Sequence, residues 1–247
     1  MELVLKDASV FKRSIEAISV LIDEAELVIK KDGLELKATD PSQISMVDFS
    51  MPKKAFEKFD ASETRLGLDL DYLNQVLSRV AAGDKLILEL DEKKSFLNVS
   101  FKGKAERSFQ VPLIDISASE VPTPKIDFDS ELSINSGFLQ GAFKDAALIS
   151  SHITVGCDDK KFFVKANSSK GNLNEEARHD KETINEMKVK SDCKSMFPLD
   201  YLQDMLKAAS SGEFVSIHIK SNAPIKISYL IGEASITYFL APRIESA

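Results

Sequence analysis

The amino-acid sequence repeats one pattern of strands and helices in its two halves. The stretch ELVIKKDGLELKA, which ends at Ala38, aligns with ITVGCDDKKFFVKA, which ends at Ala166, at an offset of 128 residues. Both stretches predict a strand, a charged turn and a second strand. Further along, LDYLNQVLSR begins at Leu70 and LDYLQDMLKA begins at Leu199, an offset of 129 residues. Two blocks whose offsets agree to within one residue predict two similar domains.

Each half is predicted to contain two amphipathic helices among short strands. Apolar residues at spacings of four and three indicate the first helix, and Ser9 just before them is the expected N-cap. This stripe consists of Phe11, Ile15, Ile18 and Ile22, with a weaker copy at Leu139, Phe143, Ala146 and Ser150. The second stripe consists of Leu73, Val76, Leu77 and Val80, with its copy at Leu202, Met205, Leu206 and Ala209. The expected fold class is α+β, with two helices packed on antiparallel sheet in each domain.

A proline-containing segment separates the two halves. Residues 115–129, DISASEVPTPKIDFD, combine small polar residues with Pro122 and Pro124, which stop a helix and favour extended backbone. We therefore expect a first domain at 1–114, a connector at 115–129 and a second domain at 130–247. The residues alone do not distinguish a plain linker from a connector with a binding role.

Composition and charge exclude several classes of protein. Hydrophobic residues make up 43% and charged residues 29%, which is typical of a globular chain rather than a disordered one. No stretch approaches the roughly 18 apolar residues of a membrane span, so we expect a cytoplasmic protein without membrane contact. Cys157 and Cys193 have the spacing of neither a disulfide framework nor a zinc site. The formal charge of −7 argues against strong nucleic-acid binding unless the cations gather on one surface.

The sequence lacks the motifs of common catalytic and cofactor sites. It contains no P-loop, dinucleotide-binding, nucleophile-elbow or zinc-protease pattern, and no histidine has a neighbour at metal-ligand spacing. Acidic clusters occur at 23–26, 91–92, 158–159 and 175–176, where we expect solvated turns. A small enzyme that uses a carboxylate pair is the alternative. We expect no catalysis, no metal and no cofactor.

Cations lie opposite the apolar stripes of the predicted helices. They are Lys12, Arg13, Arg79, Lys144 and Lys207. Taken singly, each is most simply a solvated surface charge, but equivalent helices of duplicated domains can be brought onto one surface. Polar residues that could join the cations at phosphates are Ser19, Asn74, Gln75, Ser78, Gln140 and Gln203.

Several short motifs stand at the spacing of one known family. They are LIDEA at 21–25, TDPSQISMV at 39–47, LDYL at the start of each second helix, and YFLAPRIE at 238–245. With the duplicated halves and the connector, they make the chain resemble the proliferating cell nuclear antigen family of sliding clamps along essentially its whole length. The short connector and short tail are similar to archaeal members.

This resemblance implies a DNA clamp fold that closes into a ring, expected here to be a homotrimer with six similar domains. Helices would line the hole, and the five cations named above would face double-stranded DNA without reading its sequence. The ring would act as a processivity factor, and in an archaeon it would associate with the nucleoid. Because a ring holds DNA by topology, weak and salt-sensitive phosphate contacts suffice for an acidic chain.

The resemblance also implies which sheet edges meet between subunits. A head-to-tail contact would pair the segment near 105–111 with the segment near 173–178, which satisfies otherwise exposed backbone groups. The interface residues it implies are Arg107, Phe109, Val111, Glu175, Ala177 and Arg178.

Partner capture in this family uses an apolar groove beneath the connector. Short peptides of DNA polymerase, clamp loader, nuclease and ligase would insert hydrophobic and aromatic side chains there. The groove residues implied here are Gln43, Ile44, Met46, Val121, Pro224, Phe239, Ala241 and Pro242. Burying Ile44 and Met46 under a peptide would contribute about 1–3 kcal/mol each.

Some residues depart from the family pattern. Thr39 stands where methionine is common at the groove, and several helix positions lack a cation that relatives often have. These positions are Ser19, Gln75, Ser78 and Phe143. We therefore expect an altered groove preference and few phosphate contacts. The alternative within the same fold is a clamp-like peptide-binding scaffold, in a checkpoint or heteromeric ring, without a direct role in processivity.

Overall fold

The computed structural model describes residues 1–91, 95–116 and 121–243, and its contacts divide the chain into two units. The N-terminal unit comprises Met1–Pro41, Val47–Val121 and Leu230–Ile236. The C-terminal unit comprises Ser42–Met46, Pro122–Tyr229 and Thr237–Ala247. Part of the predicted connector, at 117–120, and the last four residues of the predicted second domain lie outside the described residues. The boundaries at 114 and 130 stay predictions.

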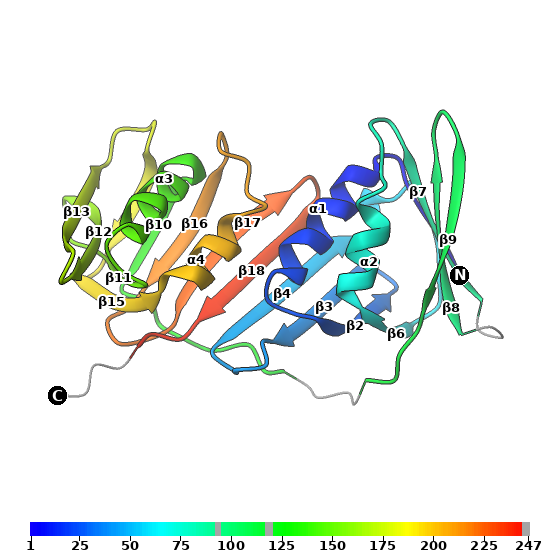
Figure 1. The fold of residues 1–247 in the computed structure, drawn as a ribbon, viewed down its shortest axis with the longest axis horizontal. Helices are drawn as coiled ribbons and strands as arrows, with labels where there is room; N and C mark the ends of the chain where they lie inside the picture. Colours follow the sequence, from blue (N-terminus) through cyan, green and yellow to red (C-terminus); the bar gives the residue numbers. More distant parts are fainter. Residues whose placement is uncertain (92–94, 117–120, 244–247) are drawn as a thin grey trace. The chain divides into compact units, whose positions relative to one another are not determined.

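Strands form most of the first half of the chain, and two helices lie side by side over them (Figure 1). The helices are α1 (Ala8–Ser19) and α2 (Leu70–Leu77), with a short 3-10 helix η1 (Lys53–Ala55). The strands are β1 (Glu2–Leu5), β2 (Glu24–Lys30), β3 (Gly33–Thr39), β4 (Ser45–Pro52), β5 (Lys58–Asp60), β6 (Thr64–Asp69), β7 (Lys85–Asp91), β8 (Phe96–Lys102) and β9 (Glu106–Pro112). Hydrogen bonds order them as β5-β1-β7-β8-β9 and as β6-β2-β3-β4.

The second half repeats this arrangement with its own two helices. These are α3 (Ser136–Ala147) and α4 (Leu199–Leu206). The strands are β10 (Ser130–Asn135), β11 (His152–Cys157), β12 (Lys161–Ser168), β13 (Gly171–Arg178), β14 (Ile184–Val189), β15 (Cys193–Pro198), β16 (Phe214–Ile219), β17 (Ile225–Ile231) and β18 (Ala234–Leu240). Their orders, β14-β10-β16-β17-β18 and β13-β12-β11-β15, match those of the first half strand for strand. The duplication and the α+β class are therefore confirmed.

The helices cover a sheet face because the strands alternate in burial. In β16, Val215, Ile217 and Ile219 are buried, whereas the residues between them are half-buried. On α1, Phe11 and Ile15 are fully buried against this kind of face in their own unit. Such burial stabilises the fold by about 1.5–3 kcal/mol for each large apolar side chain.

The start of α1 differs from the prediction. The helix begins at Ala8, and the N-cap is Asp7, whose carboxylate accepts a hydrogen bond from the Ser9 amide at 2.9 Å. Ser9 is therefore the second helical residue rather than the cap. Aspartate and serine are about equally good N-cap residues, so residue type alone does not decide between Asp7 and Ser9. Ile22 is buried as expected but lies beyond the helix end.

Residues of three acidic clusters lie on strands rather than in the expected turns. Glu24 and Glu26 belong to β2, Glu175 and Glu176 belong to β13, and Asp91 ends β7, whereas Glu92 lies outside the described residues. A cation on the neighbouring strand offsets one of these charges, because Lys161 at the start of β12 donates a hydrogen bond to the Glu176 carboxylate at 2.7 Å. Among the described residues, no group of three or more histidines, cysteines or acids could hold a metal ion, and no helix could cross a membrane.

Candidate DNA-facing cleft, peptide groove and subunit edges

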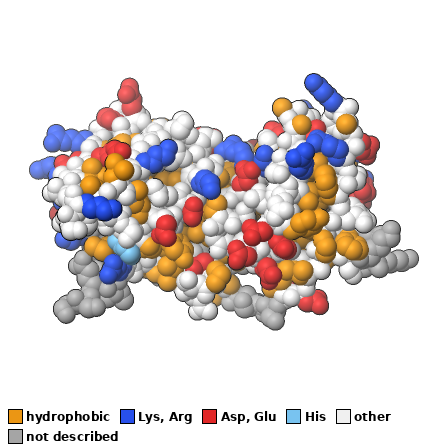
Figure 2. Space-filling view, in the orientation of Figure 1, with side chains coloured by type: hydrophobic (Ala, Val, Ile, Leu, Met, Phe, Trp, Pro, Cys, Tyr) orange, Lys and Arg blue, Asp and Glu red, His pale blue; other side chains and the backbone are white. Residues whose placement is uncertain are grey.

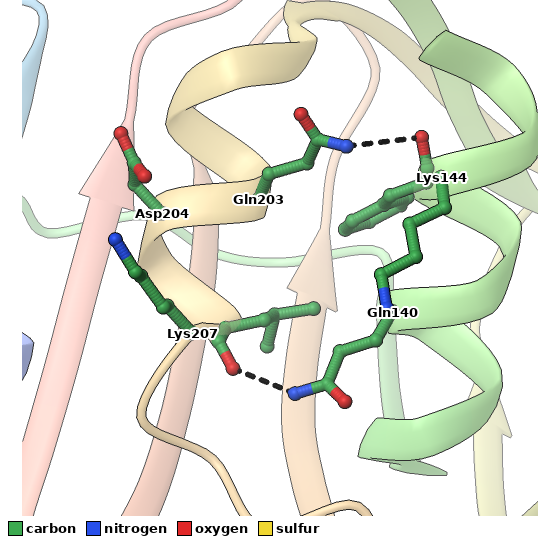
Figure 3. Close-up of a pocket in the computed structure, with 7 residues that line it drawn as sticks. Gln140, Lys144, Gln203, Asp204 and Lys207 are labelled. Atoms are coloured by element: carbon green, nitrogen blue, oxygen red, sulfur yellow. Dashed lines mark hydrogen bonds between the residues drawn. The ribbon is translucent and has the colours of Figure 1, made fainter. Parts of the chain in front are cut away.

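A cleft of about 350 Å³ lies between α3 and α4, on the helix face of the C-terminal unit (Figure 3). Its lining residues are Gln140, Phe143, Lys144, Gln203, Asp204, Leu206 and Lys207. Lys144 lies in the last turn of α3, and Lys207 directly follows α4; both are exposed. Two of the five predicted DNA-facing cations are thus brought to one cleft.

The two glutamines in this cleft hold the helices together. The Gln140 amide nitrogen donates to the carbonyls of Leu206 and Ala209 at 2.9 and 3.0 Å. The Gln203 amide nitrogen donates to the Phe143 carbonyl at 3.3 Å. Helix-terminal carbonyls lack a partner within the helix, so Gln140 supplies one at the end of α4. The Gln140 amide nitrogen thus makes two hydrogen bonds within the chain and the Gln203 amide nitrogen makes one, so Gln203 keeps one N–H group that could contact a phosphate.

An acid, Asp204, shares the cleft with the two lysines. Its side chain comes from α4, three residues before Lys207 (Figure 3). Burial raises the pKa of Asp204, and the charge of Lys207 opposes that rise. At neutral pH the carboxylate lowers the positive potential that the cleft offers to a phosphate.

The three predicted cations of the N-terminal unit have different surroundings. The Lys12 ammonium lies 3.8 Å from the Glu16 carboxylate one turn further along α1. Arg13 is half-buried and interacts within the chain. Arg79 is exposed, and its carbonyl accepts a hydrogen bond from the Arg107 guanidinium at 2.6 Å.

None of the five cations has a cation at the equivalent position of the other half. At the offsets of the repeat, Lys12 matches Gln140, Arg13 matches Gly141, Arg79 matches Ala208, Glu16 matches Lys144, and Ser78 matches Lys207. Figure 2 shows that basic and acidic side chains are interspersed on the helix-bearing face. The duplication therefore repeats the fold without repeating the charges.

The predicted groove residues fall into a buried floor and a half-exposed rim. Met46 and Phe239 are only 5% and 6% exposed, so they have little surface left for a peptide to cover. Ile44 is half-buried, and its carbonyl accepts a hydrogen bond from the Ala241 amide at 2.7 Å. A peptide could therefore gain little from covering Met46, less than the expected 1–3 kcal/mol, and its place in the groove stays a prediction.

Other groove positions also come together in the C-terminal unit. Gln43 is exposed with φ of 58°, and Pro224 and Pro242 are half-buried. Beyond β18, the Arg243 amide donates to the Met196 carbonyl at 2.8 Å and so fixes the segment that carries Ala241. Val121 is half-buried and belongs to the N-terminal unit. The end of the LAPRIE motif, at 244–245, lies outside the described residues.

The two strands predicted to meet between subunits lie at sheet ends. β9 ends one sheet and β13 ends another. On β9, Phe109 is half-buried against Phe101, with ring centroids 5.8 Å apart, whereas Val111 is fully buried. On β13, Ala177 is 8% exposed. Val111 and Ala177 thus point into their own cores, and only their backbones can serve an interface.

The charged interface candidates are partly engaged within the chain. Arg107 forms an ion pair with buried Asp84 and holds the Arg79 carbonyl. Arg178 is exposed, and Glu175 is half-buried. Burial raises the pKa of Glu175, and the charge of Asp145 raises it further.

Sequence patterns missed one exposed apolar residue near the end of β12. Leu148, the C-cap of α3, is 73% exposed. Its neighbour Ile149 has a carbonyl that accepts a hydrogen bond from Ser168 at 2.7 Å, which places this corner at the end of β12. A single exposed leucine is ordinary on a protein surface, so Leu148 becomes a candidate contact residue only through the proposed use of the neighbouring β13 edge. The only available signal was a leucine outside the apolar stripe.

A duplicated α+β chain with paired helices on antiparallel sheets, in which β9 and β13 are end strands, belongs to the DNA-clamp class of folds. The models of the N-terminal and C-terminal domains of proliferating cell nuclear antigen match residues 1–121 and 122–244. The chain belongs to the proliferating cell nuclear antigen family.

Relatives and solved structures agree with this assignment. The DNA polymerase sliding clamp of Methanococcus vannielii is 38% identical over 96% of this chain and 96% of its own length. The structure of PCNA from Thermococcus kodakaraensis matches with a TM-score of 0.94 at 26% identity, covering 98% of this chain and 99% of that one. A. fulgidus PCNA bound to the C-terminal region of FEN-1 matches with a TM-score of 0.90 at 27% identity, covering 100% and 99%.

Proposed function

We propose that this chain is a DNA polymerase sliding clamp, a processivity factor that encircles duplex DNA and tethers replication proteins to it. The observation that carries the proposal is the match of both halves to the family's domains, together with similarity to curated sliding clamps over nearly the full length. The role is not enzymatic, because the clamp holds other enzymes at their substrate. The test is primer extension on a circular template with an archaeal replicative polymerase. Longer products on addition of the chain and its loader support the proposal, and unchanged products refute it.

The DNA-facing surface is proposed to be the helix face with Lys12, Arg13, Arg79, Lys144 and Lys207. Two of these cations lie in the α3–α4 cleft, and a third, Lys12, is partly neutralised by Glu16. Few phosphates can therefore be contacted at once, and each contact steepens the salt dependence of binding by a slope of about 0.9. Such weak contact suits a ring that must slide.

The ring is proposed to close by head-to-tail pairing of β9 of one chain with β13 of the next. Both strands are sheet ends, and pairing them satisfies backbone groups that would otherwise invite uncontrolled association. Arg107, Phe109 and Arg178 supply side chains at this contact, and Leu148 adds an apolar one. A homotrimer predicts a mass of about three times 27.3 kDa by light scattering. A monomer at micromolar concentration would contradict it.

The peptide groove is proposed to bind short segments of DNA polymerase, clamp loader, nuclease and ligase. The proposed rim residues in the C-terminal unit are Gln43, Ile44, Pro224, Ala241 and Pro242, with Met46 and Phe239 as the buried floor. Val121, in the N-terminal unit, stays a prediction. Support comes from the backbone hydrogen bond of 2.7 Å between the Ala241 amide and the Ile44 carbonyl, which joins two segments that are distant in the sequence. The similar A. fulgidus PCNA binds the C-terminal region of FEN-1.

A further inference from the structure

Cys157 and Cys193 lie directly opposite each other on paired strands. Cys157 ends β11, Cys193 begins β15, and the antiparallel register makes them Cα partners. Their sulfur atoms are 3.5 Å apart. Opposed residues in an antiparallel ladder have Cα atoms about 4.5 or 5.5 Å apart. Both values lie within the roughly 4.4–6.8 Å that a disulfide spans.

The pair lies at the end of its ladder and is buried. Cys157 and Cys193 are 1% and 3% exposed, and both are free thiols. β15 is the last strand of its sheet, and the residues that precede Cys193 are exposed. Ladder ends open more readily than ladder centres, so a small reagent can reach Cys193 when the end of β15 frays.

A buried hydroxyl stands beside Cys193. The Ser130 oxygen is 3.2 Å from the Cys193 sulfur and 3.4 Å from the Ile219 carbonyl oxygen. The hydroxyl can donate to the sulfur when Cys193 is a thiolate, and to the Ile219 carbonyl once the thiolate is gone. The Ser130 hydroxyl therefore has an acceptor for its proton both before and after the Cys193 thiolate reacts.

We propose that Cys157 and Cys193 are a disulfide-forming site that closes without rearrangement of the sheet when the chain meets a peroxide. The Cys193 thiolate attacks one peroxide oxygen, the O–O bond breaks, and hydroxide leaves and takes up a proton to become water. Cys193 is then a sulfenic acid. The Cys157 sulfur attacks the Cys193 sulfur, the S–O bond breaks, and the hydroxyl leaves with the Cys157 proton as a second water. Two thiols are oxidised by two electrons, and one peroxide is reduced to two waters.

The order of attack follows from the surroundings of each sulfur. Hydrogen bonds from the Cys157 thiol and, to a smaller extent, from Ser130 lower the pKa of Cys193 to about 7, although burial and the nearby charge of Asp129 oppose this. The same hydrogen bond raises the pKa of Cys157, as do burial and Asp158. Since the thiolate is the nucleophile, Cys193 reacts first and Cys157 resolves the intermediate.

The main test uses the full chain at pH 8 with hydrogen peroxide, followed by denaturation and alkylation. We expect loss of both alkylation sites and a crosslinked peptide that joins Cys157 to Cys193. The closed loop should raise the Tm of the oxidised chain by roughly 5–15 °C, because it restricts the unfolded chain. Two free thiols after treatment, under conditions that oxidise glutathione, would overturn the proposal. So would a crosslink that forms only in urea.

Two variants test the mechanism separately from folding. A Cys157→Ser chain should accumulate sulfenic acid at Cys193, detected with dimedone; an unlabelled Cys193 would count against the assigned order. Ser130→Ala should slow crosslinking several-fold at pH 7 yet reach the same final mass, because it removes a donor to the thiolate and leaves both sulfurs in place. An unchanged rate would exclude the role given to Ser130.

Discussion

Replacing Ile44 by aspartate should weaken partner-peptide binding far more than it weakens the fold. Ile44 is half-buried in the free chain, so a peptide can cover only about half of its side chain. Full burial of such a side chain is worth about 1.5–3 kcal/mol, which leaves about 1 kcal/mol for binding. An aspartate at the same place also brings a carboxylate that the peptide must desolvate, at a cost of about 1–3 kcal/mol. The sum of about 2–4 kcal/mol corresponds to a loss of roughly 30- to 1000-fold in affinity.

The assay is fluorescence anisotropy with a labelled C-terminal peptide of FEN-1, combined with thermal unfolding of each variant. The backbone hydrogen bond from Ala241 to Ile44 does not involve the side chain, so Ile44→Asp should fold. Ile44→Val is the matched control, because it keeps an apolar rim and should change the affinity less than about fivefold. An Ile44→Asp chain that is folded and binds with unchanged affinity would refute the groove assignment.

Three further perturbations test the other surfaces. Leu148→Asp should shift the assembly toward smaller species in light scattering. The control Leu230→Asp changes a leucine that is also exposed and should not shift it. Equal effects of the two variants would exclude Leu148 from the proposed subunit contact. Asp204→Asn should raise the affinity for a short labelled duplex by about 1.4- to 5-fold per site, because Asp204 shares the cleft with Lys144 and Lys207. The control variant Asp200→Asn should raise it less. A decrease in affinity for Asp204→Asn would contradict the proposed role of the cleft. Glu175 has a raised pKa in the folded chain, so its ionisation lowers the stability of the fold at neutral pH. Glu175→Gln should therefore raise the Tm at pH 7. This gain should vanish as the pH falls toward 4.5, the ordinary pKa of a glutamate.

The sequence was most informative about the repeated fold. The two offsets and the apolar stripes depend on spacing along one chain, and spacing is what a sequence displays directly. Both pairs of helices and the duplication of the fold were confirmed on that basis, whereas the order of the strands came from the structure. The cap of α1 was misplaced because Asp7 and Ser9 are both good capping residues.

Side-chain environments were harder to predict, because they depend on residues distant in the chain. Met46 and Ile44 look equally suited to a groove, yet only Ile44 keeps usable surface. The sequence pattern makes Gln140 look like a surface amide, but its amide nitrogen donates hydrogen bonds to two carbonyls at the end of α4. The two cysteines lie far apart in sequence, and only the β11–β15 register makes them neighbours. In each case the decisive partner comes from another element.

The mismatch of cations between the two halves has a consequence for motion along DNA. The proposed ring of three chains would contain six alike units, because each chain contributes two. Its electrostatic pattern would be only threefold, because Lys144 and Lys207 have no basic counterparts at Glu16 and Ser78. A duplex rotating inside the ring would meet equivalent charge three times per revolution rather than six. Rotational stepping of the clamp along the helical backbone should therefore follow the period of the subunits and not that of the domains.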